Sequence, residues 1–184
     1  GGRISRPENI NGNWSVNGGG SFNIGLDTLN RWDVSGGING SYNHHIGYVN
    51  LNRTATPDRN VTHSYNLSPD VSLSYRNRWF NISLNGRLTY ARTENELQAS
   101  RNLTTWNFNY GGNTRIDLNQ LNGRAASSTS YWPVLSTDFH VYSKRGYSDA
   151  TLNTNELIWN AQLSYSFLRG KKLTVIDRKS SCRE

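Results

Sequence analysis

The chain of 184 residues has one cysteine, Cys182, so it can form no internal disulfide and no cysteine-based metal site. It has no run of 18 apolar residues, which excludes a transmembrane helix. P-loop, GxSxG and HExxH motifs are absent, and we expect no enzyme activity, cofactor or metal. The segment from Gly1 to Pro7 has no apolar signal-peptide core, so we expect a processed chain or a piece of a longer one.

Aliphatic residues are scarce. Only 34% of the residues are hydrophobic and the mean hydropathy is -0.73, whereas globular domains contain roughly 45–50% apolar residues. Yet 11% are aromatic, including 6 Trp and 10 Tyr, which argues against disorder. A transmembrane β-barrel needs a thin apolar band, aromatic girdles and a polar lumen, and this composition suits it. A soluble secreted β protein is the alternative, but its core would require more Val, Ile and Leu.

The basic charge points to no particular partner. The net charge is +7 and the isoelectric point is about 9.8. The Lys and Arg residues are scattered among apparent turns and polar positions, so no nucleic-acid partner is expected. Acidic headgroups of outer-membrane lipid offer a reason for part of the charge.

Period-2 alternation is the main structural signal. Every second residue from Leu157 to Phe167 is apolar or aromatic, and most residues between them carry amides or hydroxyls. Such alternation indicates a strand between an apolar and a polar medium. The pattern predicts an all-β fold, an antiparallel up-and-down transmembrane β-barrel segment of about eight long meander strands. The expected strands cover about 13–26, 31–48, 63–76, 80–91, 105–118, 135–142 and 157–167, with a short eighth at 172–176.

The connections alternate in length. Short ones at Asp27, Asn77 and Gly170 are expected on the periplasmic side, and longer ones around Pro57, Glu96 and Tyr147 outside the cell. The connection at 119–131 departs from this alternation and reads as an insertion. Pro69 predicts a bulge or a strand edge. We expect residues 1–176 to form a partial outer-membrane barrel and residues 177–184 an irregular tail.

The alternation assigns side chains to two predicted faces. The lipid-facing set is Trp14, Phe22, Trp32, Leu73, Tyr75, Ile82, Leu84, Trp106, Phe108, Phe139, Trp159, Leu163, Tyr165 and Phe167. The lumen-facing set is Asn85, Arg87, Asn109, Arg115, Asp138, His140, Asn160 and Gln162. The four histidines have no convincing metal-ligand spacing with a third ligand, so no metal site is predicted.

Several stretches resemble a known family. Residues 144–149 read KRGYSD, residues 153–163 read NTNELIWNAQL and residues 166–171 read SFLRGK; upstream, TWNFN at 105–109 and GGNT at 111–114 are similar in kind. From about Asn9 to Val175 the chain resembles the C-terminal part of outer-membrane β-barrels related to TonB-dependent receptors. The resemblance implies nutrient uptake or ligand passage across the outer membrane of a Gram-negative bacterium, with a TonB-type energiser or a surface lipoprotein as partners.

The chain departs from that family in two ways. Such barrels have about 22 strands and an N-terminal plug, whereas no plug is recognisable here. They also continue with further strands to an aromatic final residue, but the alternation stops at Ile176. Two other readings stay open. One is a complete eight-stranded structural or adhesive barrel. The other is a membrane-embedded hydrolase using Ser136 and His140, whose spacing on one strand is loose for a direct triad.

Overall fold

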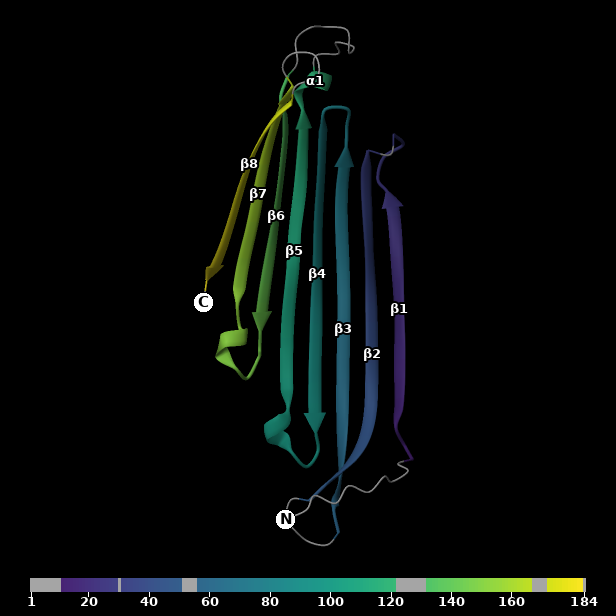
Figure 1. Cartoon of the computed structure of the whole chain (residues 1–184). Coiled ribbons are helices and arrows are strands. Elements are labelled where there is room, and N and C mark those ends of the chain that lie inside the picture. Colours follow the sequence, from purple (N-terminus) through teal and green to yellow (C-terminus); the bar gives the residue numbers. More distant parts are fainter. Residues whose placement is uncertain (1–10, 30, 51–55, 122–131, 167–171, 184) are drawn as a thin grey trace.

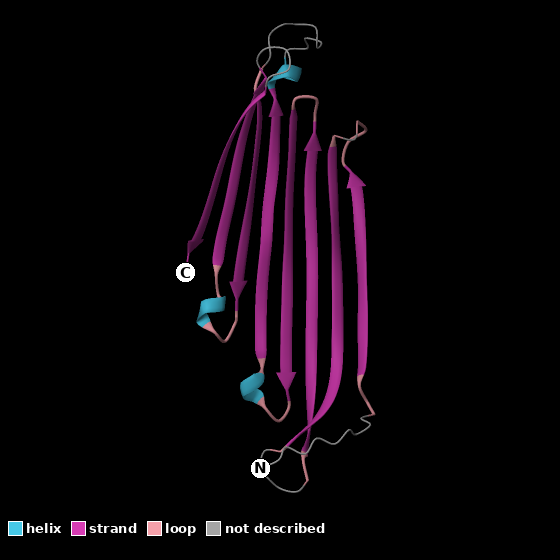
Figure 2. Ribbon diagram, in the orientation of Figure 1, coloured by secondary structure: helices cyan, strands magenta, loops and turns pink. Residues whose placement is uncertain are grey.

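The computed structural model describes residues 11–29, 31–50, 56–121, 132–166 and 172–183. Eight antiparallel strands form one sheet in the order in which they follow along the chain (Figures 1 and 2). This confirms the prediction of an all-β meander of eight strands. The strands are β1 (Trp14–Gly25), β2 (Trp32–Val49), β3 (Asp58–Arg76), β4 (Phe80–Asn95), β5 (Leu103–Asp117), β6 (Val134–Arg145), β7 (Asn155–Ser166) and β8 (Lys172–Arg183).

Among the described residues, helical structure is limited to three short pieces in the connections. These are η1 (Ala99–Arg101), α1 (Leu118–Leu121) and η2 (Ala150–Leu152). None of the helices in the described ranges is long and apolar enough to cross a membrane. Figure 2 shows these pieces beyond the strand ends, so the sheet alone defines the molecule's two faces.

The sheet is open. Within the described residues β1 pairs only with β2 and β8 only with β7, so these two strands form the edges seen at the two sides of Figure 1. The structure therefore shows an open sheet, and the barrel to which this predicted segment would belong is not observed. Connections β1–β2 and β3–β4 lie at one end of the sheet, and β4–β5 and β6–β7 at the other (Figure 1).

The register separates the side chains onto two faces. One carries the even-numbered positions of β1, β2, β4 and β5 and the odd-numbered positions of β3, β6, β7 and β8; we call it the apolar face, and the opposite side the polar face. One row across the apolar face consists of Ile24, Val34, Leu73, Leu84, Gly112, Phe139, Trp159 and Lys179.

The sheet has almost no interior. Ile46 and Val61, which are 4% and 7% exposed, are the only buried hydrophobic residues among those described. On the apolar face Val16 is 59% exposed and Val71 is 54% exposed. Soluble domains cover one face of a sheet with another layer, because exposed apolar surface costs roughly 25 cal/mol per Å². The described residues supply no such layer.

Three features differ from the sequence-based expectations. Strand β3 begins at Asp58, because β2 continues to Val49 and provides a pairing partner. Pro69 causes no bulge: Leu67 pairs with Tyr90 and Asp70 with Arg87, so two residues lie between them on each strand. The missing N–H removes a ladder bond without shifting the register.

The third difference concerns the C-terminus. Residues 177–183 belong to β8, which pairs with β7 along its whole length, where we expected an irregular tail. Backbone groups pair whatever the side-chain pattern, so the loss of alternation after Val175 does not end the strand. Phe167, the turn at Gly170 and most of the predicted insertion at 119–131 lie outside the described residues.

Candidate functional site

The two predicted sets of face residues lie on opposite sides of the sheet. All described members of the predicted lipid-facing set, from Trp14 to Tyr165, occupy the apolar face. All members of the predicted lumen-facing set occupy the polar face. The medium that each face contacts stays a prediction.

Aromatic side chains form two lines across the apolar face. At the end near the β1–β2 turn, Trp32 packs on Tyr75 with ring centroids 4.6 Å apart, and Phe80 lies 6.1 Å from Tyr75. The second line lies near the other end of the strands. There the centroid separations are 5.0 Å for both Tyr42–Tyr65 and Trp14–Tyr42, and 4.4 Å for Tyr90–Trp106. We call these lines the turn-end belt and the loop-end belt.

The two belts are ten residues apart on three consecutive strands. The pairs are Trp32 and Tyr42 on β2, Tyr65 and Tyr75 on β3, and Phe80 and Tyr90 on β4. Ten residues of strand span about 33 Å, which a tilt of about 40° reduces to about 25 Å. On these strands the apolar-face positions between the belts carry no charged side chain. We call this region the apolar band.

The indole N–H of Trp159, on the apolar face, is hydrogen-bonded within the protein. The indole Nε1–H of Trp159 donates to Thr137 Oγ1 at 2.8 Å, and the Thr137 hydroxyl donates to the backbone carbonyl of Asn160 at 3.0 Å. An indole in water needs no such partner, but one in an apolar medium does. The relay therefore suits a face that is not in contact with water.

Strand β8 does not follow this chemistry. Asp177 and Lys179 lie on its apolar-face side, opposite Ala161 and Trp159 of β7. Ile176 lies on the polar face opposite Gln162 and is exposed. The uncharged surface therefore ends at the first residues of β8, Leu173 and Val175.

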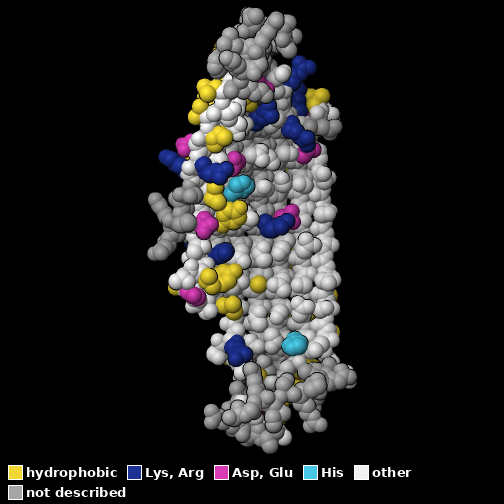
Figure 3. All heavy atoms as spheres, viewed as in Figure 1, with side chains coloured by type: hydrophobic (Ala, Val, Ile, Leu, Met, Phe, Trp, Pro, Cys, Tyr) yellow, Lys and Arg dark blue, Asp and Glu magenta, His cyan; other side chains and the backbone are white. Residues whose placement is uncertain are grey.

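The polar face contains a trough across β1 to β6. It consists of three adjoining hollows of about 410, 580 and 290 Å³. Asn39 lines the first two and Asp70 lines the last two, so the three are continuous. In Figure 3 this side of the sheet is covered mainly by side chains that are neither hydrophobic nor charged near β1 to β4, with charged groups at intervals.

Two opposite charges lie side by side in the trough, and no described interaction pairs them. Asp70 on β3 lies opposite Arg87 on β4. Within the described residues, no ion pair or side-chain hydrogen bond joins Asp70 to Arg87. No other described side chain forms such a contact with either residue. Gly37 explains part of this, since a Cβ there would lie 3.1 Å from Asp70 Oδ1. The carboxylate leans over the glycine and leaves both charged groups open to a ligand.

The predicted hydrolase residues do not form a triad. His140 Nε2 lies 3.9 Å from Asp138 Oδ2, which accepts a hydrogen bond from Asn160 Nδ2 at 2.8 Å. Among the described contacts no hydrogen bond joins Ser136 to His140. Asn160 Oδ1 is buried without a partner in the described part of the chain. The arrangement is a polar network on the polar face.

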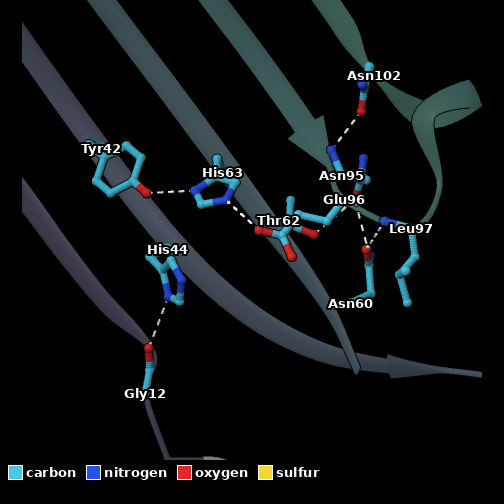
Figure 4. A network of polar contacts seen from close by, with 10 residues as sticks. All are labelled: Gly12, Tyr42, His44, Asn60, Thr62, His63, Asn95, Glu96, Leu97 and Asn102. Carbon is cyan, nitrogen blue, oxygen red and sulfur yellow. Dashed lines mark hydrogen bonds and ion pairs between the residues drawn. The ribbon is translucent and has the colours of Figure 1, made fainter. Parts of the chain in front are cut away.

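A hydrogen-bonded cluster anchors the loop end of the sheet (Figure 4). Asn60, which is buried, accepts from the backbone N–H of Leu97 at 3.0 Å, and Thr62 Oγ1 donates to Asn95 Oδ1 at 2.8 Å. His63 lies between the Tyr42 hydroxyl at 2.6 Å and Glu96 Oε1 at 3.5 Å. A neutral ring protonated at Nε2 satisfies both contacts. The β4–β5 connection is thereby fixed against β2 and β3.

Comparisons with known proteins do not place the chain in a family. A scan against protein-family models gave no match, and searches of curated proteins and of solved structures gave none. The relation to TonB-dependent receptors therefore stays a prediction that rests on the motifs quoted above.

The trough is not predictable from the sequence. Asp70 and Gly37 lie on different strands, and only the register makes them neighbours. Arg87 and Asn109 were assigned to the polar side, but nothing in their local sequence shows that they line a hollow with Asp70. The available signal was the density of glycine on the first two strands.

Proposed function

We propose that this chain is part of an outer-membrane β-barrel, with the apolar face against lipid and the polar face lining a water-filled lumen. The observation that carries the proposal is the apolar band, an uncharged surface with aromatic belts ten residues apart. Outer-membrane barrels have an apolar zone about 25 Å tall between aromatic girdles. A two-faced sheet without a covering layer suits that setting, because lipid takes the place of a second protein layer.

The role that fits this architecture is uptake or passage of a polar nutrient. The trough presents amides, hydroxyls and the charged groups of Asp70 and Arg87 to the lumen side. The family resemblance supports a TonB-dependent-receptor-like parent with further strands beside β1 and β8. A TonB-type energiser or a surface lipoprotein would be the partners of that parent. No enzymatic step is part of the proposal.

Paired cysteine variants test which face meets lipid. In a Cys182→Ser background, Leu84→Cys labels the apolar face and Ser83→Cys, its neighbour, labels the polar face. After reconstitution in liposomes, a fluorophore at position 84 should be quenched by nitroxide-bearing lipid and one at position 83 by aqueous iodide. Equal quenching of both by iodide, with the chain in the soluble fraction, would contradict the proposal and favour a soluble β protein.

The complete eight-stranded barrel is the alternative that the strand number favours, since eight strands make a small closed barrel. Immunoblotting of the outer-membrane fraction separates the two cases. A band near 20.8 kDa, with a disulfide forming between cysteines placed on β1 and β8, would support the small barrel. A much larger band would support the receptor-like parent.

A further inference from the structure

A groove on the apolar face is placed next to two arginines. It has a volume of about 300 Å³ and is lined by Pro69, Val71, Gly86, Leu88, Phe108 and Tyr110, together with backbone of Asp70 and Arg87. Gly86 leaves it open, since a Cβ there would meet its nearest atoms, on Tyr110 and Val71, at 3.8 and 3.9 Å. Those are ordinary packing distances, so a side chain would fit at position 86. The backbone does not require glycine there, and the absence of a side chain leaves open space in the groove.

The arginines lie beyond the loop-end mouth of this groove. Tyr90 and Trp106 form the next row outward, and Arg145 follows Trp106 in that row. Arg92 is one row further out, opposite Thr104. Both arginines are on the apolar face and flank the aromatic pair. On the strands that pair with β4, this face bears no other arginine or lysine near the groove.

Both arginines are held in place by partners within the protein and keep donors to spare. Arg92 forms an ion pair with Glu94, and Arg145 donates to Asn155 Oδ1 at 3.0 Å and to the Lys144 carbonyl at 3.2 Å. A guanidinium has five N–H donors, so each can still bind an anionic oxygen. Gly146, at φ +84°, lets the chain pass against the Thr104 carbonyl and so fixes Arg145 beside β5.

The dimensions match one lipid molecule. Gly86 and Arg92 are six residues apart on β4, which is about 20 Å along the strand. That is the length of a membrane lipid's acyl chain, so a chain in the groove would bring its headgroup to the arginines. An arginine guanidinium can bind a phosphate group through two parallel hydrogen bonds. Aromatic rings favour the level of the lipid headgroups.

We propose that the apolar face holds one phosphate-bearing anionic lipid, with an acyl chain in the Gly86 groove and the phosphate between Arg92 and Arg145. The proposal rests on the proposed contact of this face with lipid. The groove accommodates the acyl chain, and the arginines select the phosphate-bearing headgroup.

The test measures retained lipid by native mass spectrometry on the full chain in nanodiscs. The discs contain equal amounts of phosphatidylglycerol and phosphatidylcholine with identical acyl chains. The unchanged protein should retain phosphatidylglycerol preferentially. Arg92→Gln with Arg145→Gln should reduce this preference roughly 25-fold, about fivefold for each arginine. Arg92→Lys with Arg145→Lys should keep most of it, and Arg78→Gln at the turn end should change nothing.

Groove variants test the acyl-chain part. Gly86→Leu should lower retention of both lipids several-fold and Gly86→Ala should lower it less, whereas Gly18→Leu, on the apolar face with open space around it, should have no effect. Equal retention of the two lipids by the unchanged protein would overturn the proposal. An effect of Arg78→Gln as large as that of the double variant would do the same. Displacement of the lipid by millimolar inorganic phosphate, with Gly86→Leu silent, would show a simple anion site instead.

The cysteine-labelling assay separates this failure from failure of the proposed function. If Leu84→Cys still reports lipid contact while phosphatidylglycerol shows no preference, the face meets the membrane but the lipid site is absent. If Leu84→Cys reports water, both proposals fail together.

Discussion

Strands β1 to β7 and strand β8 belong to the same sheet but present different chemistry to the same face. On β7 the apolar-face residues from Leu157 onward are Leu157, Trp159, Ala161, Leu163 and Tyr165. Their described partners on β8 include Asp177 and Lys179. The backbone pairing is continuous through both halves of β8. Pairing therefore does not require alternation, whereas contact with an apolar medium does, because charge in that medium is costly.

The largest expected effect comes from giving β4 a charge like that of β8. Leu84→Lys places an ammonium in the apolar band and should lower the free energy of unfolding in lipid by about 2–4 kcal/mol. Urea titration in liposomes measures it. Ser83→Lys, one residue away on the polar face, is the matched control and should change it by less than about 0.5 kcal/mol. Equal effects would show that the two faces meet the same medium.

The reverse change should make β8 resemble the other strands. Asp177→Val with Lys179→Val removes both charges from its apolar-face side and should stabilise the chain in lipid by about 1–3 kcal/mol. The same urea titration measures the gain. Arg178→Val, on the polar face between them, should give none. No gain from the double variant would mean that this half of β8 lies outside the membrane.

Breaking the relay between β6 and β7 should have a smaller effect. Thr137→Val leaves the Trp159 indole N–H without an acceptor and should cost about 1–3 kcal/mol in lipid. Tryptophan fluorescence during unfolding reports it. Thr137→Ser keeps the hydroxyl and should restore most of the loss. If the Thr137→Val variant is as stable as the unchanged protein, the Trp159 indole N–H is hydrogen-bonded to water, and this part of the face does not contact lipid.

The smallest expected effect concerns Asp149, in the connection between β6 and β7. The hydroxyl and the backbone N–H of Thr151 donate to Asp149 and lower the pKa of its carboxyl below the usual 3.8. A lowered folded pKa gives stability that is present above the unfolded value and lost as pH falls through the folded one. The protection factor of the Thr151 amide, which corrects for the intrinsic pH dependence of exchange, should therefore fall only below about pH 4. Asp149→Ala should lower this protection factor at neutral pH and remove its further fall in acid.

Much of the fold was readable from the sequence because strand alternation is local. Seven of the strands and the division of their side chains between two faces follow from period 2 alone. The structure differs from the sequence-based expectation where backbone pairing between strands outweighs the local side-chain pattern. Pro69 was expected to disturb β3 but is held in register on both sides, and residues 177–183 pair with β7 despite their charges.

The candidate sites were less readable. Asp70 and Arg87 are 17 positions apart in the sequence, and the Asp70 carboxylate lies over Gly37, on a third strand. The groove at Gly86 likewise combines residues of β3, β4 and β5. No local pattern identifies a hollow whose walls come from three strands.

The sequence by itself determined that this chain forms long two-faced strands, because side-chain period and composition are properties of each segment. Tertiary structure alone decided which strands are neighbours, that the edges stay open, and which face the last charges occupy. These depend on register, and a slip of one residue would move every side chain to the other face.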